Sequence, residues 1–270
     1  MKANKRTFIF SKKDGQLKGV SVDNRKINFA NGPRFIGARR ADRSLDQFYN
    51  HDDEKAKEKD RTYSEFPDAA VFTKLDVKED GGNLVVTANY KLGNLDKAQW
   101  TINPSGELAL DYTYNFSGVV DLMGIRFDYP EDQVISKRWL GAGPYRVWQN
   151  RIHGTQYDVW ENDYNDPIPG ETFTYPEFKG YFGDVSWMNI QTKEGTISLT
   201  NETPDAYIGV YQPRDGRDRL LYTLPESGIS VLNVIPPVRN KVNSTDLCGP
   251  SSQPKWVNGP QTGRVIFRFM

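Results

Sequence analysis

The sequence predicts an all-β protein built as one large antiparallel β-sandwich. Apolar and polar residues alternate in many short segments, which is typical of strands with one buried face. Short turn signals rich in glycine separate these segments, and convincing helical periodicity is nearly absent. Because many strands linked by short hairpins favour two packed sheets, we expect residues 1–270 to form a single sandwich domain.

The alternating segments follow one another along most of the chain. We predict strands over 7–10, 17–22, 71–77, 83–90, 98–102, 107–116, 124–128, 196–200, 207–211, 228–234 and 264–269. Turn signals separate apolar runs at Asp14-Gly15, Gly81-Gly82, Pro104-Ser105-Gly106, Lys193-Glu194-Gly195 and Arg214-Asp215-Gly216. Because glycine tolerates the left-handed backbone that tight turns need, we expect reversals of the chain at these places.

Two segments interrupt this rhythm. Residues 45–66 are highly charged with both signs mixed, so we expect a solvated loop there, or a short helix. Residues 139–187 hold twelve aromatic residues in 49 positions, about twice the chain average of 13%. Because aromatic side chains in irregular structure are costly to expose to water, we expect these loops to pack on one another or on a partner.

Composition excludes several classes of function. Basic and acidic residues both number 35, so no broad field favours nucleic acid or an anionic membrane. A single cysteine, Cys248, excludes internal disulfides, and with only two histidines a zinc site is not expected. No apolar run approaches the ~20 residues of a membrane span, and a signal peptide is not evident. The compartment stays open, because if the chain is a fragment of a longer periplasmic or secreted parent, the leader would have been left behind.

The stretch KRWLGAGPYRVWQNR, residues 137–151, mixes aromatic, glycine and cationic residues in a way that suits a saccharide pocket. Sugars present apolar C–H faces and a rim of hydroxyl groups. Flat aromatic rings cover the faces, while Asn, Gln and Arg side chains bind the hydroxyl groups. The alternative is a packed corner between a strand and a loop, in which the Trp rings fill the core.

This stretch also resembles a known family, the fifth, C-terminal or small-chain domain of glycoside hydrolase family 2 β-galactosidases. The family's W-L-G-x-G-P segment and its following N/D-R pair are matched by Trp139, Leu140, Gly141, Gly143, Pro144 and Asn150-Arg151. Further segments resemble family segments in the same order: 10–27, 33–42, 124–130 and 175–190. The resemblance implies a galactose mutarotase-like sandwich, and it covers nearly the whole chain.

In that family the catalytic acid and nucleophile lie on a preceding (β/α)₈ barrel, which this chain lacks because no strand–helix alternation occurs in it. The resemblance therefore implies a domain that is not catalytic by itself, that packs against the barrel of its parent chain and that forms a wall of the carbohydrate site. We expect the side chains of Trp148, Asn150, Arg151, Trp160, Glu177, Arg39 and Asp42 to bind the carbohydrate. We expect no metal and no cofactor.

One family feature is missing. The family contributes a tryptophan from a late hairpin, which by order corresponds to residues 224–242. Here that segment has no aromatic residue, and Ile229, Ser230 and Val231 occupy the corresponding position. The departure indicates a different sugar or a different wall of the site.

Other functions remain open at the level of the sequence. A structural domain could dock on its parent through its aromatic loops without touching sugar. A complete aldose epimerase would need a histidine acid and a glutamate base, for which His153 and Glu177 are the available pair. The oxygen-rich run Asn162 to Asp166 could hold a hard cation, although Asx-rich turns are commonly just turns.

Overall fold

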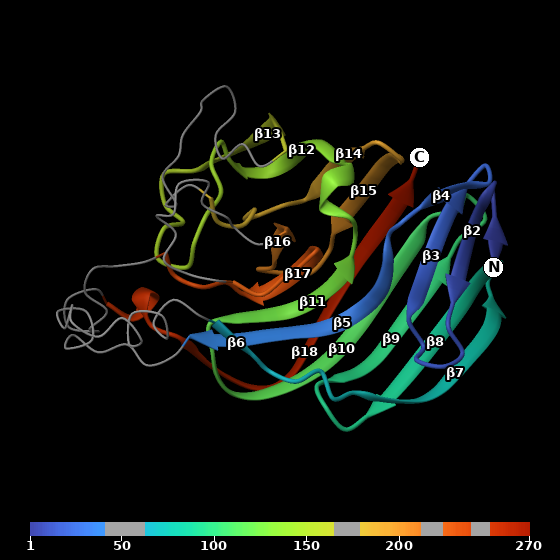
Figure 1. The fold of residues 1–270 in the computed structure, drawn as a ribbon, viewed down its shortest axis with the longest axis horizontal. Helices are drawn as coiled ribbons and strands as arrows, with labels where there is room; N and C mark the ends of the chain where they lie inside the picture. Colours follow the sequence, from blue (N-terminus) through green and yellow to red (C-terminus); the bar gives the residue numbers. More distant parts are fainter. Residues whose placement is uncertain (41–62, 165–178, 212–223, 239–248) are drawn as a thin grey trace.

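The computed structural model describes residues 1–40, 63–164, 179–211, 224–238 and 249–270. Two curved antiparallel sheets pack face to face, and both chain termini lie at the same side of the molecule (Figure 1). In the described residues the helical structure consists of two short 3-10 turns, Glu131–Gln133 and Pro250–Ser252. The predicted all-β antiparallel sandwich is therefore confirmed.

The first sheet carries the features that matter most for function. Its strands run in the order β1 (Lys2–Ala3), β2 (Arg6–Phe10), β3 (Leu17–Val22), β5 (Ala30–Arg40), β11 (Leu122–Asp128), β17 (Ile229–Val234) and β16 (Tyr207–Val210). Two short strands, β4 (Arg25–Ile27) and β6 (Tyr63–Glu65), pair with β3 and β5. The long strand β5 thus reaches from β3 at one end of the sheet to β6 at the other.

In the described residues the second sheet also has nine strands and forms the other layer of the sandwich. Its strands run in the order β13 (Gln156–Asp163), β12 (Val134–Gly143), β14 (Trp187–Thr192), β15 (Gly195–Asn201), β18 (Lys255–Phe269), β10 (Leu108–Val120), β9 (Leu95–Ile102), β8 (Asn83–Lys91) and β7 (Val71–Asp80). Strands β10 and β18 pair over thirteen residues and form the spine of this sheet.

The main hydrophobic core fills the space between the two sheets. Its largest side chains include Trp100, Trp139, Phe29, Phe127 and Phe267, all fully buried. Phe29 stacks on Phe127 with ring centroids 4.8 Å apart, while Phe267 meets the Phe127 ring edge to face. Aromatic contacts of this kind add to the hydrophobic gain of burial, so the aromatic content of the chain serves largely to hold the sheets together.

A second hydrophobic cluster lies on the outer face of the first sheet. Ile36, Ala38, Leu122 and Leu232 point away from the main core and would face water if the sheet were bare. Segments outside the sheet cover them, with Val147, Trp148 and Tyr181 packed on top. This part of the outer face is therefore buried, and the covering segments form a third layer over the two sheets there.

The hairpin predictions hold where the structure describes the chain. Gly15, Gly81, Gly82, Gly106 and Gly195 all have positive φ angles in the turns that join paired strands. The fifth turn signal, residues 214–216, and the charged segment 45–62 lie outside the described residues. Local turn chemistry thus fixes the neighbouring strand pairs.

Candidate functional site

The conspicuous stretch after Gly143 forms a tight corner on the outer face of the first sheet. We use the name corner for residues 144–151 with the segments 236–238 and 251–253 that they contact. Val147 exchanges two backbone hydrogen bonds with Tyr181, of 2.8 and 2.7 Å. Trp148 and Arg151 exchange two more, of 3.2 and 2.9 Å, so residues 148–151 reverse direction within four positions. The chain at the corner is held by paired backbone groups.

Gln149 and Asn150, at the tip of this reversal, hold neighbouring segments through their side-chain amides. Gln149 Nε2 donates to the carbonyl oxygens of Ser251 and Gln253, at 2.8 and 2.7 Å. Asn150 Nδ2 donates to the Val238 carbonyl at 3.2 Å, and Asn150 Oδ1 accepts from the Val238 N–H at 2.8 Å. Three separate segments of the chain therefore meet at this tip.

These contacts refine the role predicted for Asn150. Its side-chain oxygen and nitrogen already hydrogen-bond the backbone of Val238. Backbone that leaves a sheet needs such hydrogen-bond partners, because its N–H and carbonyl groups have lost those of the neighbouring strand. A carboxamide can accept and donate further hydrogen bonds beyond one of each. Asn150 is half-buried, so its side chain can hold Val238 and also make one more hydrogen bond.

Trp148, which we expected to bind the carbohydrate, instead fits the alternative of a ring that fills the core. Its side chain is 0% exposed and meets the Tyr181 ring edge to face, with centroids 5.9 Å apart. The ring belongs to the second hydrophobic cluster with Ile36 and Leu232. A ring without an exposed face cannot stack on a sugar, so we assign Trp148 to packing beneath the corner.

Arg39 also lies differently from the prediction. Side chains alternate along β5, so Arg39 points to the opposite face of the sheet from Ala38 and Arg40. Arg39 is exposed, whereas Arg40 is 6% exposed and its backbone N–H donates to the Asp121 carboxylate at 2.8 Å. Arg40 is therefore the arginine on the same face as the corner.

Trp160 lies on the edge strand β13, beside the glycine motif. It pairs with Trp139 in register, and its Nε1 donates to the Gln156 carbonyl at 3.3 Å. A Cβ atom on Gly143 would stand 2.4 Å from the Trp160 ring, so glycine is needed there for the ring to lie flat on the backbone. Trp160 is half-buried, which leaves part of its indole accessible.

The other predicted residues are distributed as follows. Arg151 is half-buried at the end of the corner reversal. Glu177 and Asp42 lie outside the described residues. His153 is exposed, and its backbone carbonyl accepts from the Tyr145 hydroxyl at 3.0 Å. The structure therefore brings Trp148, Asn150 and Arg151 together in one turn, while Trp160 and Arg39 belong to other surfaces.

The described part of the chain also lacks two features that other classes of function would need. Within it, no group of three or more His, Cys, Asp or Glu side chains is arranged to hold a metal ion. The same residues include no helix with the length and apolar character of a membrane span. In the late hairpin segment, Ile229, Ser230 and Val231 are all buried in strand β17 and contribute to the sheet.

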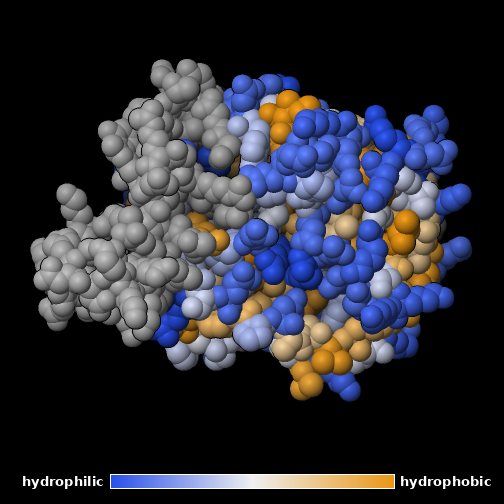
Figure 2. Space-filling view, in the orientation of Figure 1, coloured by the Kyte–Doolittle hydropathy of each residue, from blue (hydrophilic) through white to orange (hydrophobic). Residues whose placement is uncertain are grey.

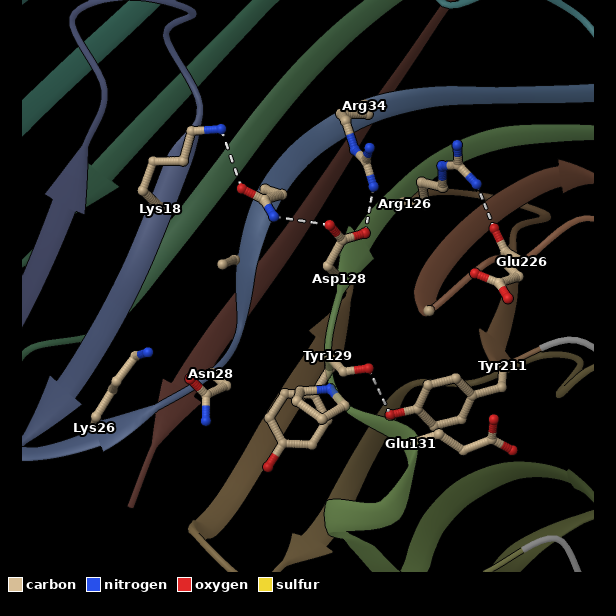
Figure 3. A pocket seen from close by; sticks show the side chains of 14 residues that line it. Lys18, Lys26, Asn28, Arg34, Arg126, Asp128, Tyr129, Glu131, Tyr211 and Glu226 are labelled. Carbon is tan, nitrogen blue, oxygen red and sulfur yellow. Dashed lines mark hydrogen bonds and ion pairs between the residues drawn. The ribbon is translucent and has the colours of Figure 1, made fainter.

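The opposite end of the same outer face is open and polar. A pocket of about 840 Å³ lies between β3, β4, β5 and β11, beside the turn that follows β11 (Figure 3). Four cationic side chains line it: Lys18, Lys26, Arg34 and Arg126. Three carboxylates line it as well: Asp128, Glu131 and Glu226. Figure 2 shows that hydrophilic residues predominate on the face in view, with hydrophobic residues in smaller patches towards its margin.

A chain of polar contacts crosses the pocket from β3 to β11. Lys18 Nζ donates to Asn31 Oδ1 at 3.1 Å, and Asn31 Nδ2 donates to Asp128 Oδ2 at 2.8 Å. The other oxygen of Asp128 accepts from Arg34 (Figure 3). Lys18 also pairs with Asp14, at 2.9 Å. These contacts fix four side chains from three strands in one arrangement.

Two tyrosines close the pocket on the side of the β11 turn. Burial raises the pKa of Tyr129 and of Tyr211, so both hydroxyl groups keep their protons at neutral pH. The Tyr129 hydroxyl donates to Glu194 at 3.0 Å, and the Tyr211 hydroxyl donates to the Tyr129 carbonyl at 3.0 Å. The turn is therefore anchored from both sides.

Sequence reasoning did not single out the pocket residues, although a signal was present. Arg34 and Arg126 face each other across β5 and β11 in register, where like charges are normally unfavourable. Both lie in segments, 33–42 and 124–130, that the resemblance had already marked. Without the strand register the two arginines could not be recognised as neighbours.

Comparison with known proteins gives a family match. A family model described as beta galactosidase small chain matches residues 2–244. None of the curated proteins compared with this chain matches it.

Several solved structures are similar to the chain. The α-N-acetylgalactosaminidase of Bifidobacterium bifidum in complex with GalNAc has 11% identity and a TM-score of 0.46, covering 100% of this chain and 36% of that one. The galactose 1-epimerase of Lactobacillus acidophilus NCFM has 8% identity and a TM-score of 0.48, covering 100% of this chain and 92% of that one. The chain thus spans about a third of the length of the N-acetylgalactosaminidase.

Proposed function

The chain belongs to the beta galactosidase small chain family, and on that premise we propose that it is a carbohydrate-binding domain that helps to complete the active site of a β-galactosidase-like glycoside hydrolase. In this proposal the domain is not catalytic by itself. The observation that carries it is the family match, which extends over residues 2–244 of 270. The catalytic carboxylates would come from a (β/α)₈ barrel elsewhere in the parent protein.

The corner supports a role as a wall of that site. Its backbone is pinned by three pairs of contacts, to Tyr181, Val238 and the segment 251–253. A binding wall needs such rigidity, because polar groups held in place lose less freedom when they meet a sugar. We propose Asn150 and Arg151 as direct contacts at this wall, with Trp148 supporting the turn from below.

The remaining predicted residues complete the proposal. Asp42 and Glu177 stay proposed carbohydrate contacts. Trp160 on β13 and Arg39 on the opposite face of β5 would contact carbohydrate only on surfaces away from the corner. Residues 1–270 would act as one domain. An isolated wall binds weakly, because half of the pocket belongs to the partner and the cost of association is unchanged.

The test is a titration of the purified chain with galactose, lactose and other neutral saccharides, followed by intrinsic tryptophan fluorescence. We expect a weak saturable change for the wild type and its loss in Arg151→Ala. Arg138→Ala is the matched control, because Arg138 is an exposed arginine on β12 paired with Glu161 at 3.9 Å. No response to any sugar, or equal responses in both variants, would argue against the wall.

A docking domain without sugar contact is the second candidate. The edge strand β13 exposes Tyr157 and Val159, 59% and 41% exposed, and so presents both apolar side chains and a free strand edge. This candidate predicts that the isolated chain self-associates, and that Val159→Lys abolishes the association. Sedimentation velocity with and without saccharide separates the two candidates.

A further inference from the structure

We propose that the pocket between β3, β4, β5 and β11 is a second saccharide site, which takes an uncharged polyhydroxylated ligand. The pocket is separated from the corner by the apolar row of Ile36, Gly124 and Leu232, so it does not depend on the function proposed for the corner. Its lining includes residues of β3, β4, β5 and β11, and Figure 3 shows their polar side chains around the pocket.

The size of the pocket suits a small sugar. Its volume of about 840 Å³ falls within the ~300–1,000 Å³ range of small-molecule sites. The pocket lies against the sheet, so the strands themselves supply its floor. Sites carried by strands hold their side chains more precisely than sites carried by loops.

Three of the four cations that line the pocket have an acidic neighbour inside the protein. Arg34 pairs with Asp128, and Lys18 pairs with Asp14. Arg126 lies 3.5 Å from the Glu65 carboxylate, and it donates to the carbonyl oxygen of Glu226. Because each of these cations already has an acidic neighbour, an added anion would meet carboxylates as well as cations. A ligand without net charge avoids that repulsion.

The hydrogen-bonding groups left over are of both kinds and lie next to one another. A guanidinium has five N–H donors, and the described residues engage one donor of Arg34 and two nitrogens of Arg126. The Nε atoms are buried, so the donors that remain for a ligand are on the terminal nitrogens. The carboxylate of Asp128 adds acceptor sites between them. A hydroxyl group donates and accepts at once, so neighbouring hydroxyl groups of a sugar match such a surface.

The arrangement is prepared before any ligand arrives. Register places Arg34 opposite Arg126, and the contacts from Lys18 through Asn31 to Asp128 hold the carboxylate between them. Two guanidinium groups facing each other are unfavourable unless an acceptor lies close. Asp128 relieves part of that cost, and hydroxyl oxygens of a bound sugar would relieve more of it.

Backbone-amide NMR of the full chain, titrated with methyl β-galactoside and with lactose, tests the assignment. We expect saturable shift changes at the amides of the non-proline residues in 126–131 and 226–228, the two segments that contribute to the pocket lining. Arg126→Gln should weaken this binding by about tenfold or more, as expected for loss of a charged hydrogen-bond donor. Glu226→Gln changes an exposed side chain at the rim, so it tests the site with little risk to the fold. Arg138→Gln, on the other sheet, is the control.

Each outcome decides a distinct point. Shifts confined to amides 146–151 would overturn the second site and support the wall proposed above. Shifts confined to residues 126–131 would support the second site and argue against the wall. Shifts at 126–131 that appear with galacturonate and not with methyl β-galactoside would overturn the uncharged ligand, because the pocket would then be an anion site. An Arg126→Gln variant that binds like the wild type would also overturn the assignment.

Discussion

The two ends of one sheet face make the sharpest contrast in this molecule. At one end the row Ile36, Gly124, Leu232 and Tyr207 lies beneath the corner and is buried or half-buried. Two residues further along β5 and β11, Arg34 and Arg126 line the polar pocket, whereas Ser230 and Gly209 beside them on β17 and β16 stay buried. Strands β5 and β11 therefore contribute both to an interior and to a surface site.

The contrast shows that strand identity does not decide what a sheet face does. Whether a part of the face is buried or open to solvent depends on the segment that covers it. The apolar row is buried because Val147, Trp148 and Tyr181 pack on it. Where that cover ends, the residue types change from aliphatic to charged within one step of the strand period. We expect the covered end to govern stability and the open end to govern ligand binding.

The largest predicted effect is on the covered end. Trp148→Ala removes a fully buried indole and should lower the free energy of unfolding by about 3–5 kcal/mol. Trp256→Ala is the control, because that ring is 70% exposed and its loss should change the value by less than about 0.5 kcal/mol. Guanidinium denaturation measures both. Equal small changes would mean that the cover contributes little.

A tight backbone contact should give the next largest effect. A Cβ atom on Gly180 would lie 1.8 Å from the Val147 carbonyl oxygen, so Gly180→Ala must push the corner away from Tyr181. We expect a loss of about 1–3 kcal/mol in thermal unfolding. Gly19→Ala is the matched control, since the nearest atom, Ile9 Cδ1, is 3.9 Å away. If both variants melt alike, the close approach is unimportant.

Removal of the amide at the corner tip should cost less. Asn150→Ala leaves the N–H and the carbonyl of Val238 without their partner, with an expected loss of about 1–2 kcal/mol. Asn4→Ala serves for comparison, because Asn4 makes an exposed contact of 3.0 Å to the Ser105 carbonyl. Urea denaturation of the pair checks the prediction, and an Asn150 variant as stable as the Asn4 variant would contradict it.

The open end should respond to salt where the covered end does not. Arg34 and Asp128 are partly exposed, so Asp128→Asn should cost less than about 1 kcal/mol, and the cost should shrink in about 1 M NaCl. Ile36→Val, at the covered end, should cost about 0.5–1.5 kcal/mol at either salt concentration. A salt-independent loss at Asp128 would show that its pair is shielded from solvent.

The smallest predicted effect depends on pH. Partial burial acts to raise the pKa of Asp14, but hydrogen bonds from Lys18, Gln16 and Ser11 outweigh it, and the pKa is lowered. A lowered folded-state pKa stabilises the protein above the ordinary carboxyl pKa, and this contribution disappears as the pH falls through the folded-state value. At pH 7, Asp14→Asn should therefore have a free energy of unfolding lower than the wild type by less than about 1 kcal/mol. In strong acid the two proteins should be equally stable. A difference that persists in acid would contradict this assignment.

Much of the fold was predictable from the sequence because most strands have one buried face. The predicted strand 17–22 coincides with β3, and 83–90 with nearly all of β8. Strand β13 was missed for a physical reason: it lies at a sheet edge with most residues exposed on both faces, so apolar residues do not alternate there. Strand β18 is longer than predicted, because the exposed part before Arg264 is rich in Gly, Pro and polar residues.

The candidate site was less predictable. The sequence marked the right stretch, and Asn150 and Arg151 do lie together in one turn with Trp148. It could not show that Trp148 is a core residue, because an indole in a glycine-rich loop has the same composition whether it faces solvent or a second cluster. Nor could it place Arg40 rather than Arg39 on the corner side, or pair Arg34 with Arg126, since both depend on register.

The contacts of Gln149 and Asn150 have a consequence for how this protein can be altered. Both side chains grip main-chain atoms of 236–238 and 251–253 and touch no side chain there through these bonds. Main-chain atoms are the same whatever residue carries them. At exposed Ser251 and half-buried Gln253 the side chain can therefore be changed while these bonds are kept, whereas the buried residues 236–238 and Ser252 must also keep their packing. Positions 251 and 253 are thus suitable for a library that alters specificity.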